Sequence, residues 1–242
     1  MIHIVVGDPE AVRDFYIHEV LLTTRSKFFE RAMRKGWKEA EHKLVKLPED
    51  DPETFALYEQ IVYTSRIPLL DFTGSRASTS EVDGETVCNA KDKCDREYTY
   101  LSKLYVLAEK LQDVKTKNTA VEGIIVKVTH ESQTVNNMYE GGPCLPSPSS
   151  IKFMYEGTPK HCAGRQVLLD CFVYYAQHGS SDLHDALLPR LFLVDLSCEA
   201  LDHRPQQKID QPDQVKGRYM ECEEEGWSTS WSWENTETYP GK

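Results

Sequence analysis

The first 65 residues alternate between strand and helix patterns, and this alternation limits the fold more than any other feature of the sequence. Residues 2–6, 15–17 and 44–47 are rich in β-branched, aromatic or aliphatic side chains, which is typical of short strands. Between the second and third runs, apolar residues recur every three or four positions, as on one face of a helix that bends near Ser26. Asp51, followed by a proline, has the position of a helix N-cap. The pattern predicts an α+β fold.

Polar and turn-forming stretches divide the rest of the chain. Ser, Thr, Asp and Glu dominate residues 70–96 without an apolar period, which favours a surface insertion or a disordered loop. Helical periodicity then returns and continues to about residue 129. We therefore expect four segments: a first domain at 1–130 that carries the polar insertion at 70–96, a linker at 131–149, an all-α extension at 150–202, and a disordered, acidic, Trp-rich tail at 203–242.

The charge balance excludes several classes of partner. The chain has 28 Lys and Arg against 39 Asp and Glu, a formal net charge of −11, which repels nucleic-acid backbones and anionic membranes. We recognise no secretory signal and no apolar run near the roughly 20 residues of a membrane-spanning helix. The seven cysteines are odd in number and irregularly spaced, which favours free thiols in a reducing compartment. We expect an intracellular protein, in the nucleus or cytoplasm, that binds neither nucleic acid nor membrane.

The residues that could carry chemistry are better explained as structural. His18 starts a predicted helix after a strand, where an imidazole can bond backbone groups. Ser26 fits a helix cap, because no Gly-x-Ser-x-Gly elbow surrounds it. Cys88 and Cys94 could hold a metal or form a redox pair, but the paired short spacings of a structural zinc site are missing. Cys198, like Cys171, is expected to be a small core residue. We predict no catalytic residue, no metal and no cofactor.

Five residues near the start of the chain, which we expect to shape the fold, have a spacing that resembles a family signature. Their spacing is Phe-x-x-His-x-x-x-Leu-x-x-x-Ser-x-x-Phe, which resembles the signature of a BTB/POZ domain, and they are Phe15, His18, Leu22, Ser26 and Phe29. The similarity continues in the order that this family shows, through Leu47-Pro48, Asp50-Asp51-Pro52-Glu53-Thr54-Phe55, Ile61-Val62-Tyr63-Thr64 and Leu104-Tyr105-Val106-Leu107-Ala108-Glu109-Lys110-Leu111.

The chain resembles the BTB proteins of filamentous fungi in particular. In that group a helical extension often carries a Tyr-Glu-x-Thr-Pro phrase, and here the phrase is Tyr155-Glu156-Gly157-Thr158-Pro159, followed by Arg165 and Asp170. The resemblance implies a helical cluster flanked by a small β-sheet, with an all-α extension after it. We expect residues 2–67 and 97–129 to fold as one unit in which His18, Leu22 and Phe29 are buried.

The resemblance also implies a function. BTB modules are non-catalytic protein-interaction modules that self-associate or serve as scaffolds and substrate adaptors on a cullin-type ubiquitin ligase. The expected partners are therefore other proteins, a second copy of the chain and a cullin scaffold, with Tyr63, Thr64 and Ile67 as partner-binding residues. The alternatives are a nuclear or transcriptional co-regulator scaffold without a ligase, and an enzyme whose active site is assembled from scattered residues.

The acidic C-terminal tail allows two interpretations. It holds Glu221 and a run of three glutamates at 223–225, followed by Trp227, Trp231 and Trp233 among Ser and Thr. The tail is either a disordered end without a role, or a short linear motif in which Trp side chains enter a groove while glutamates steer the encounter.

Overall fold

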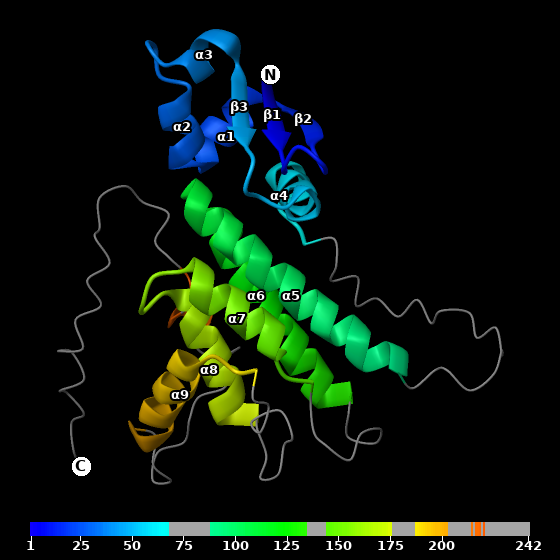
Figure 1. The fold of residues 1–242 in the computed structure, drawn as a ribbon. Coiled ribbons are helices and arrows are strands. Elements are labelled where there is room, and N and C mark those ends of the chain that lie inside the picture. Colours follow the sequence, from blue (N-terminus) through cyan, green and yellow to red (C-terminus); the bar gives the residue numbers. More distant parts are fainter. Residues whose placement is uncertain are drawn as a thin grey trace, which may run out of the picture.

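A three-stranded sheet and a larger set of helices make up the computed structural model. It describes residues 1–67, 88–134, 144–175 and 187–202, with Gln214, residues 216–218 and Met220; in 88–92 and 130–134 it describes the backbone alone. The sheet and the short helices of the first 67 residues lie at one end, and the later helices form the other (Figure 1). The predicted α+β class is confirmed.

The sheet has the strand order β2-β1-β3, built from β1 (Ile2–Val6), β2 (Arg13–Ile17) and β3 (Leu44–Leu47). β1 pairs with β2 antiparallel and with β3 parallel. Alternate residues of β1 are fully buried, so one face of the sheet covers the core. Gly7 ends β1 with φ +102°, and a Cβ there would lie 2.5 Å from the Ala11 carbonyl oxygen, so the turn requires glycine.

Two short helices follow β2, and Ser26 separates them as predicted. They are α1 (Glu19–Arg25) and α2 (Lys27–Ala32). Ser26 caps α2, because its Oγ accepts a hydrogen bond from the Phe29 N–H at 3.2 Å, and it donates to the Leu111 carbonyl at 2.5 Å. A further short helix, α3 (Lys38–His42), precedes β3.

The cap at Asp51 is confirmed. Asp51 accepts hydrogen bonds from the Glu53 N–H and the Thr54 hydroxyl, and Pro52 is the first residue of α4 (Pro52–Thr64). Ser65 ends α4 in the left-handed conformation, with φ +54°.

The polar insertion predicted at 70–96 is wrong over its last residues. Helix α5 runs over Cys88–Leu111, and Cys94 is already buried with 4 % of its surface exposed. In the sequence, residues 88–93 are mostly polar, and the apolar period of α5 begins only at Cys94. Residues 68–87 lie outside the described part of the chain.

The predicted linker at 131–149 is also shorter than expected. Helix α6 (Val114–Thr134) continues into it, and Leu145 and Ser147 at its other end are buried. Ser147 caps α7 (Pro148–Gly157) by accepting a hydrogen bond from the Ser150 N–H. Residues 135–143 lie outside the description. Helices α8 (Ala163–Tyr175) and α9 (Arg190–Asp202) complete the predicted all-α extension.

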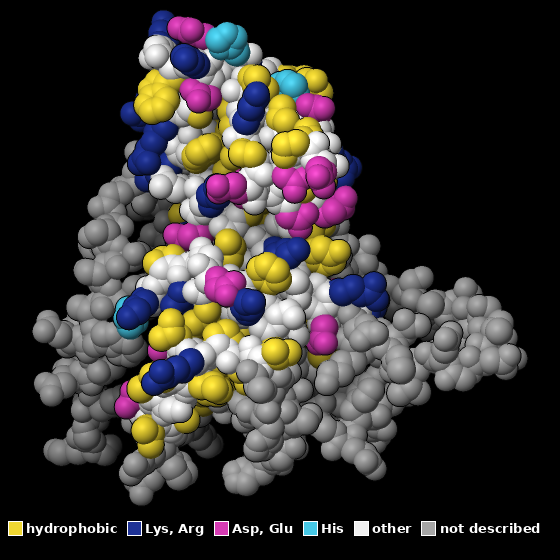
Figure 2. Space-filling view, in the orientation of Figure 1, with side chains coloured by type: hydrophobic (Ala, Val, Ile, Leu, Met, Phe, Trp, Pro, Cys, Tyr) yellow, Lys and Arg dark blue, Asp and Glu magenta, His cyan; other side chains and the backbone are white. Residues whose placement is uncertain are grey.

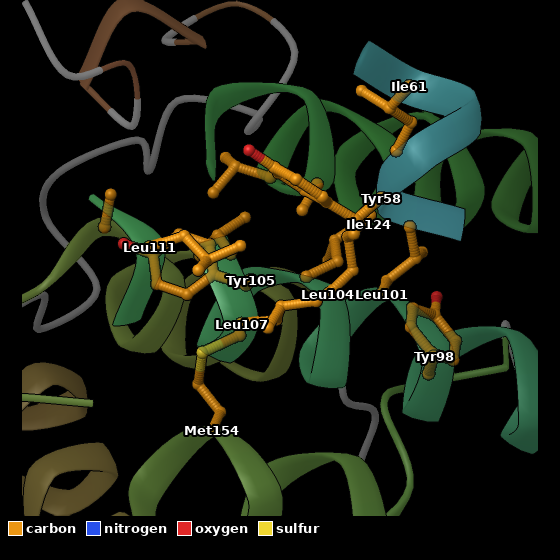
Figure 3. Packing of buried hydrophobic residues seen from close by; sticks show 14 of the residues in the cluster. Tyr58, Ile61, Tyr98, Leu101, Leu104, Tyr105, Leu107, Leu111, Ile124 and Met154 are labelled. Atoms are coloured by element: carbon orange, nitrogen blue, oxygen red, sulfur yellow. The ribbon is translucent and has the colours of Figure 1, made fainter. Parts of the chain in front are cut away.

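One apolar core joins the sheet, the first helices and the extension. α5 lies between α4 and α7 (Figure 1) and contacts both. Figure 3 shows part of this core, with Tyr58 of α4, Leu104 of α5, Ile124 of α6 and Met154 of α7 close together. Gly164 of α8 allows a close approach, since a Cβ there would meet side-chain atoms of α5 and α7 below 3.0 Å. The extension therefore shares its core with the first domain.

The expectation of a disordered tail is wrong for the few described residues beyond α9. Lys216–Arg218 form one 3₁₀ turn, the Lys216 ammonium pairs with Glu122 of α6, and Met220 packs against the core. Gln214 is exposed. The other residues of 203–242, including the three tail tryptophans, lie outside the description.

Candidate functional site

His18, a residue of the BTB-like spacing, contacts the tyrosine that we expected to bind a partner. His18 Nδ1 and the Tyr63 hydroxyl are 2.8 Å apart, and the His18 backbone N–H donates to the same hydroxyl at 3.3 Å. The two rings meet edge to face with centroids 5.9 Å apart. The start of α1 and the last turn of α4 are thereby held together.

The other two expected partner-binding residues lie beside the end of α4. The Thr64 hydroxyl donates to the Gln60 carbonyl at 2.7 Å, and Ile67 is half buried against the core. Tyr63 keeps 45 % of its surface exposed. We call His18, Tyr63, Thr64 and Ile67 the Tyr63 surface. It has an aromatic centre with a fixed orientation and a partly exposed aliphatic neighbour, which suits contact with another macromolecule.

The signature residues are buried except for one. Phe15, Leu22, Ser26 and Phe29 lie in the core with at most 4 % exposure. His18 is exposed, and its ring contacts a side chain, so the expectation of a buried histidine bonded to backbone groups is wrong. The physical reason is that the His18 ring lies edge to face against the Tyr63 ring, which is itself exposed at the end of α4.

A buried polar junction lies where α5 turns into α6, and the sequence analysis missed it. The Asp113 carboxylate is wholly buried; it accepts hydrogen bonds from the Tyr58 hydroxyl at 3.1 Å and the Thr116 N–H at 3.0 Å, and pairs with Arg25. Burial and the negative charge of Asp113 raise the pKa of Tyr58 well above 10. An Asp-x-x-Thr spacing before the apolar period of α6 was the available signal.

The segment at residues 155–159 forms a second buried junction, between α7 and α8. The Arg165 guanidinium donates to the Tyr155 carbonyl at 2.7 Å and to the Thr158 hydroxyl at 3.1 Å, and also to the Thr158 carbonyl. Its carbon lies 4.5 Å from the centroid of the Tyr155 ring. Asp170 accepts a hydrogen bond from Gln166 on the same helix. The structure thus brings Tyr155, Thr158 and Arg165 together, and their contacts stabilise the packing of α7 against α8.

Two cysteines form a disulfide, so the expectation that all thiols are free is wrong. Cys94 of α5 is bonded to Cys144, 50 residues later, just before α7. From the sequence, Cys88 was the only partner considered for Cys94, and the side chain of Cys88 lies outside the described part of the structure. Cys171 is buried as expected, and burial raises the pKa of its thiol above the ordinary value. Cys198 is exposed on α9, which contradicts its expected place in the core.

An open groove of about 500 Å³ lies between α2, α3 and β3. Its apolar lining includes Phe28 and Trp37, and Arg31, Lys38 and Lys46 supply positive charge. We call it the α2–α3 groove. Figure 2 shows basic and hydrophobic side chains side by side over this end of the molecule. Trp37 is 58 % exposed, so it offers a large accessible apolar surface. It is the N-cap residue of α3, but its side chain makes no cap hydrogen bond.

Among the side chains that the structure describes, no group of three or more His, Cys, Asp or Glu residues is placed to bind a metal ion. In the described ranges, no helix combines the length and apolar character needed to cross a membrane. In comparisons with known proteins, no family model matches the chain, and no curated protein matches it significantly.

Proposed function

We propose that this chain is a BTB-type protein-interaction module that acts as an adaptor or scaffold and docks on a cullin-type ubiquitin ligase through the Tyr63 surface. The observation that carries the proposal is the His18–Tyr63 contact, with Nδ1 and the hydroxyl 2.8 Å apart. It joins a residue of the BTB-like signature to the residue at which that resemblance implies partner binding. A small sheet beside a helical cluster, the arrangement that the resemblance implies, is a second support.

The Tyr63 surface has physical properties that favour binding. Tyrosine is among the residues that contribute most to protein interfaces, because it combines a large apolar ring with a hydroxyl and loses little conformational entropy. The contact with His18 restricts the Tyr63 side chain before any partner arrives, which lowers the entropic cost of association. Ile67, four residues later in the sequence, adds partly buried apolar area.

The buried polar residues away from the Tyr63 surface support the proposal that the module binds partners through its surface. Asp113 and Arg165 each hold a junction between two helices, and their hydrogen-bonding capacity is directed at neighbouring protein groups. A BTB-type adaptor needs a stable helical scaffold of this kind and an exposed contact surface.

The test is a binding measurement with the purified full chain and a purified cullin N-terminal domain, by isothermal titration calorimetry. We expect a complex whose dissociation constant rises about tenfold in Tyr63→Ala, the loss of about 1.4 kcal/mol expected of an interface tyrosine. Ile67→Arg introduces a charge beside Tyr63 and should weaken binding further. Phe153→Ala is the matched control, because Phe153 is similarly exposed, at 41 %, but lies on α7.

Thermal unfolding of each variant separates loss of binding from loss of fold. A wild-type chain that binds no cullin domain would refute the ligase part of the proposal and favour the co-regulator scaffold. Equal weakening by Phe153→Ala and Tyr63→Ala would refute the assignment of the Tyr63 surface.

A further inference from the structure

The α2–α3 groove carries a positive charge in a chain that is strongly acidic overall. Between residues 27 and 46 the sequence has seven Lys and Arg against three Asp and Glu, whereas the whole chain has a net charge of −11. Arg31, Lys38 and Lys46 line the groove, and Glu39 is the acidic residue among its described lining. Phe28 and Trp37 form apolar walls. The groove is therefore suited to a segment that combines acidic and large apolar side chains.

The last 22 residues of the chain have that composition. Residues 221–242 contain six glutamates and a single lysine, together with three of the four tryptophans in the protein. The fourth tryptophan is Trp37 in the groove itself. A tryptophan buries roughly 150–250 Å² of surface, so even one tail tryptophan placed against Trp37 and Phe28 would add considerable apolar contact.

The acidic segment also starts close enough to reach the groove. Lys216, just before it, pairs with Glu122 of α6, and Met220 packs against the core. Gln112, next to the start of α6, lines the groove. The helix from Val114 to Glu122 rises about 12 Å. The chain from Met220 to Trp227 can extend to about 25 Å, so all three tail tryptophans are within range.

We propose that the α2–α3 groove is a docking site for the chain's own acidic C-terminal segment, residues 221–242, with tail tryptophans against Trp37 and Phe28 and glutamates against Arg31, Lys38 and Lys46. The occupant is part of the same molecule, so its effective concentration at the groove is set by the short connection from Met220. This goes beyond the proposed function, since the groove shares no residue with the Tyr63 surface and its occupancy does not depend on a cullin.

Photo-crosslinking in the full chain tests the proposal. Trp37 is replaced by p-benzoylphenylalanine, the protein is irradiated, and crosslinked peptides are mapped by mass spectrometry. We expect crosslinks from position 37 to residues 221–242. Equal mixtures of ¹⁴N- and ¹⁵N-labelled chains show whether each crosslink joins one molecule or two. The proposal requires crosslinks within one molecule.

Charge exchange shows whether the contact is the one proposed. Lys38→Glu with Lys46→Glu should lower the crosslink yield about fivefold, since each exposed ion pair contributes up to about 1 kcal/mol. Adding Glu223→Lys and Glu225→Lys to that variant should restore the yield. Lys152→Glu with Lys160→Glu is the matched control, because both lysines are exposed outside the groove, and it should leave the yield unchanged. The melting temperature of each variant confirms that it is folded.

Three results would overturn the proposal. The first is an absence of crosslinks from position 37 to residues 221–242. The second is crosslinking only between two molecules, which would assign the groove to a second copy. The third is an equal loss of yield in the groove variant and its control, which would show an unspecific charge effect.

Discussion

Arg25 and Asp113 form an ion pair that joins helices 88 residues apart in the sequence. The Arg25 Nε lies 3.3 Å from Asp113 Oδ2, and the side chains are 10 % and 0 % exposed. Arg25 ends α1, which begins beside the Tyr63 surface, and Asp113 immediately precedes α6. The pair therefore fixes the end of the molecule that carries the Tyr63 surface to the larger helical part.

Loss of the Asp113 carboxylate should destabilise the protein strongly. Asp113→Ala leaves Arg25 without its buried partner and leaves the Tyr58 hydroxyl and the Thr116 N–H unbonded. We expect the free energy of unfolding to fall by about 3–5 kcal/mol, measured by urea denaturation. The control is Glu30→Gln, which removes the exposed ion pair with Arg34 and should cost less than about 0.5 kcal/mol. Similar losses in both variants would show that the buried pair has no special role.

Arg165 should also be hard to replace by another side chain. Arg165→Met keeps much of the apolar length but leaves the carbonyl groups of Tyr155 and Thr158 without their donors. A loss of about 2–3 kcal/mol in unfolding free energy is expected, and Arg165→Lys should recover little of it, because an ammonium cannot copy the planar guanidinium. Lys152→Met, at an exposed position on α7, is the control. If Arg165→Lys were as stable as the wild type, the described hydrogen-bond geometry would be contradicted.

The disulfide predicts a dependence of stability on redox state. Digestion without a reductant should yield a peptide pair that links Cys94 to Cys144. The double variant Cys94→Ser, Cys144→Ser should lose about 2–4 kcal/mol, because the bond closes a long loop in the unfolded chain. Cys198→Ser changes an exposed free thiol and should leave the melting temperature unchanged. Separate Cys94 and Cys144 peptides in the native protein would refute the pairing.

Two tyrosines should make the fold sensitive to alkali. Burial, followed by the neighbouring charges of Asp113 and Asp195, raises the pKa of Tyr58 and of Tyr155 above 10 in the folded state. The folded protein thus keeps protons that the unfolded chain releases near pH 10. The stabilisation is complete below pH 10 and is lost as pH rises above it.

Urea midpoints measured between pH 8 and pH 11 test this sign. We expect stability to decline above pH 10, and Tyr58→Phe to reduce the slope of that decline. Tyr16→Phe, at a residue that is 57 % exposed, should leave the slope unchanged. A rise in stability above pH 10 would show that the direction of the shift is wrong.

Local signals in the sequence were sufficient to predict several helices and strands. Asp51 and Pro52 start α4 because a side-chain cap and a proline at the first helical position act within one turn. Ser26 separates α1 and α2 for a similar reason. The alternation of apolar residues in 2–6 reports directly on the buried face of β1.

Features that depend on contacts between distant parts of the chain could not be predicted from local sequence signals. Cys94 and Cys144 are 50 residues apart, and nothing local pairs them. The polar residues that open α5 hide its helical period, so its start was placed too late. Of the candidate site, Tyr63 was predicted, but its contact with His18 requires the packing of α1 on α4, and the α2–α3 groove exists only where three elements meet.

The central claim is that the Tyr63 surface binds a protein partner of the cullin type. Hydrogen–deuterium exchange of the full chain, with and without a purified cullin N-terminal domain, tests it most directly because it locates the contact along the sequence. The account predicts that added protection is greatest in peptides covering residues 60–67 and the start of α1. Protection confined to other elements, for example the exposed apolar side chains of α9, or no protection at saturating cullin domain, would contradict it.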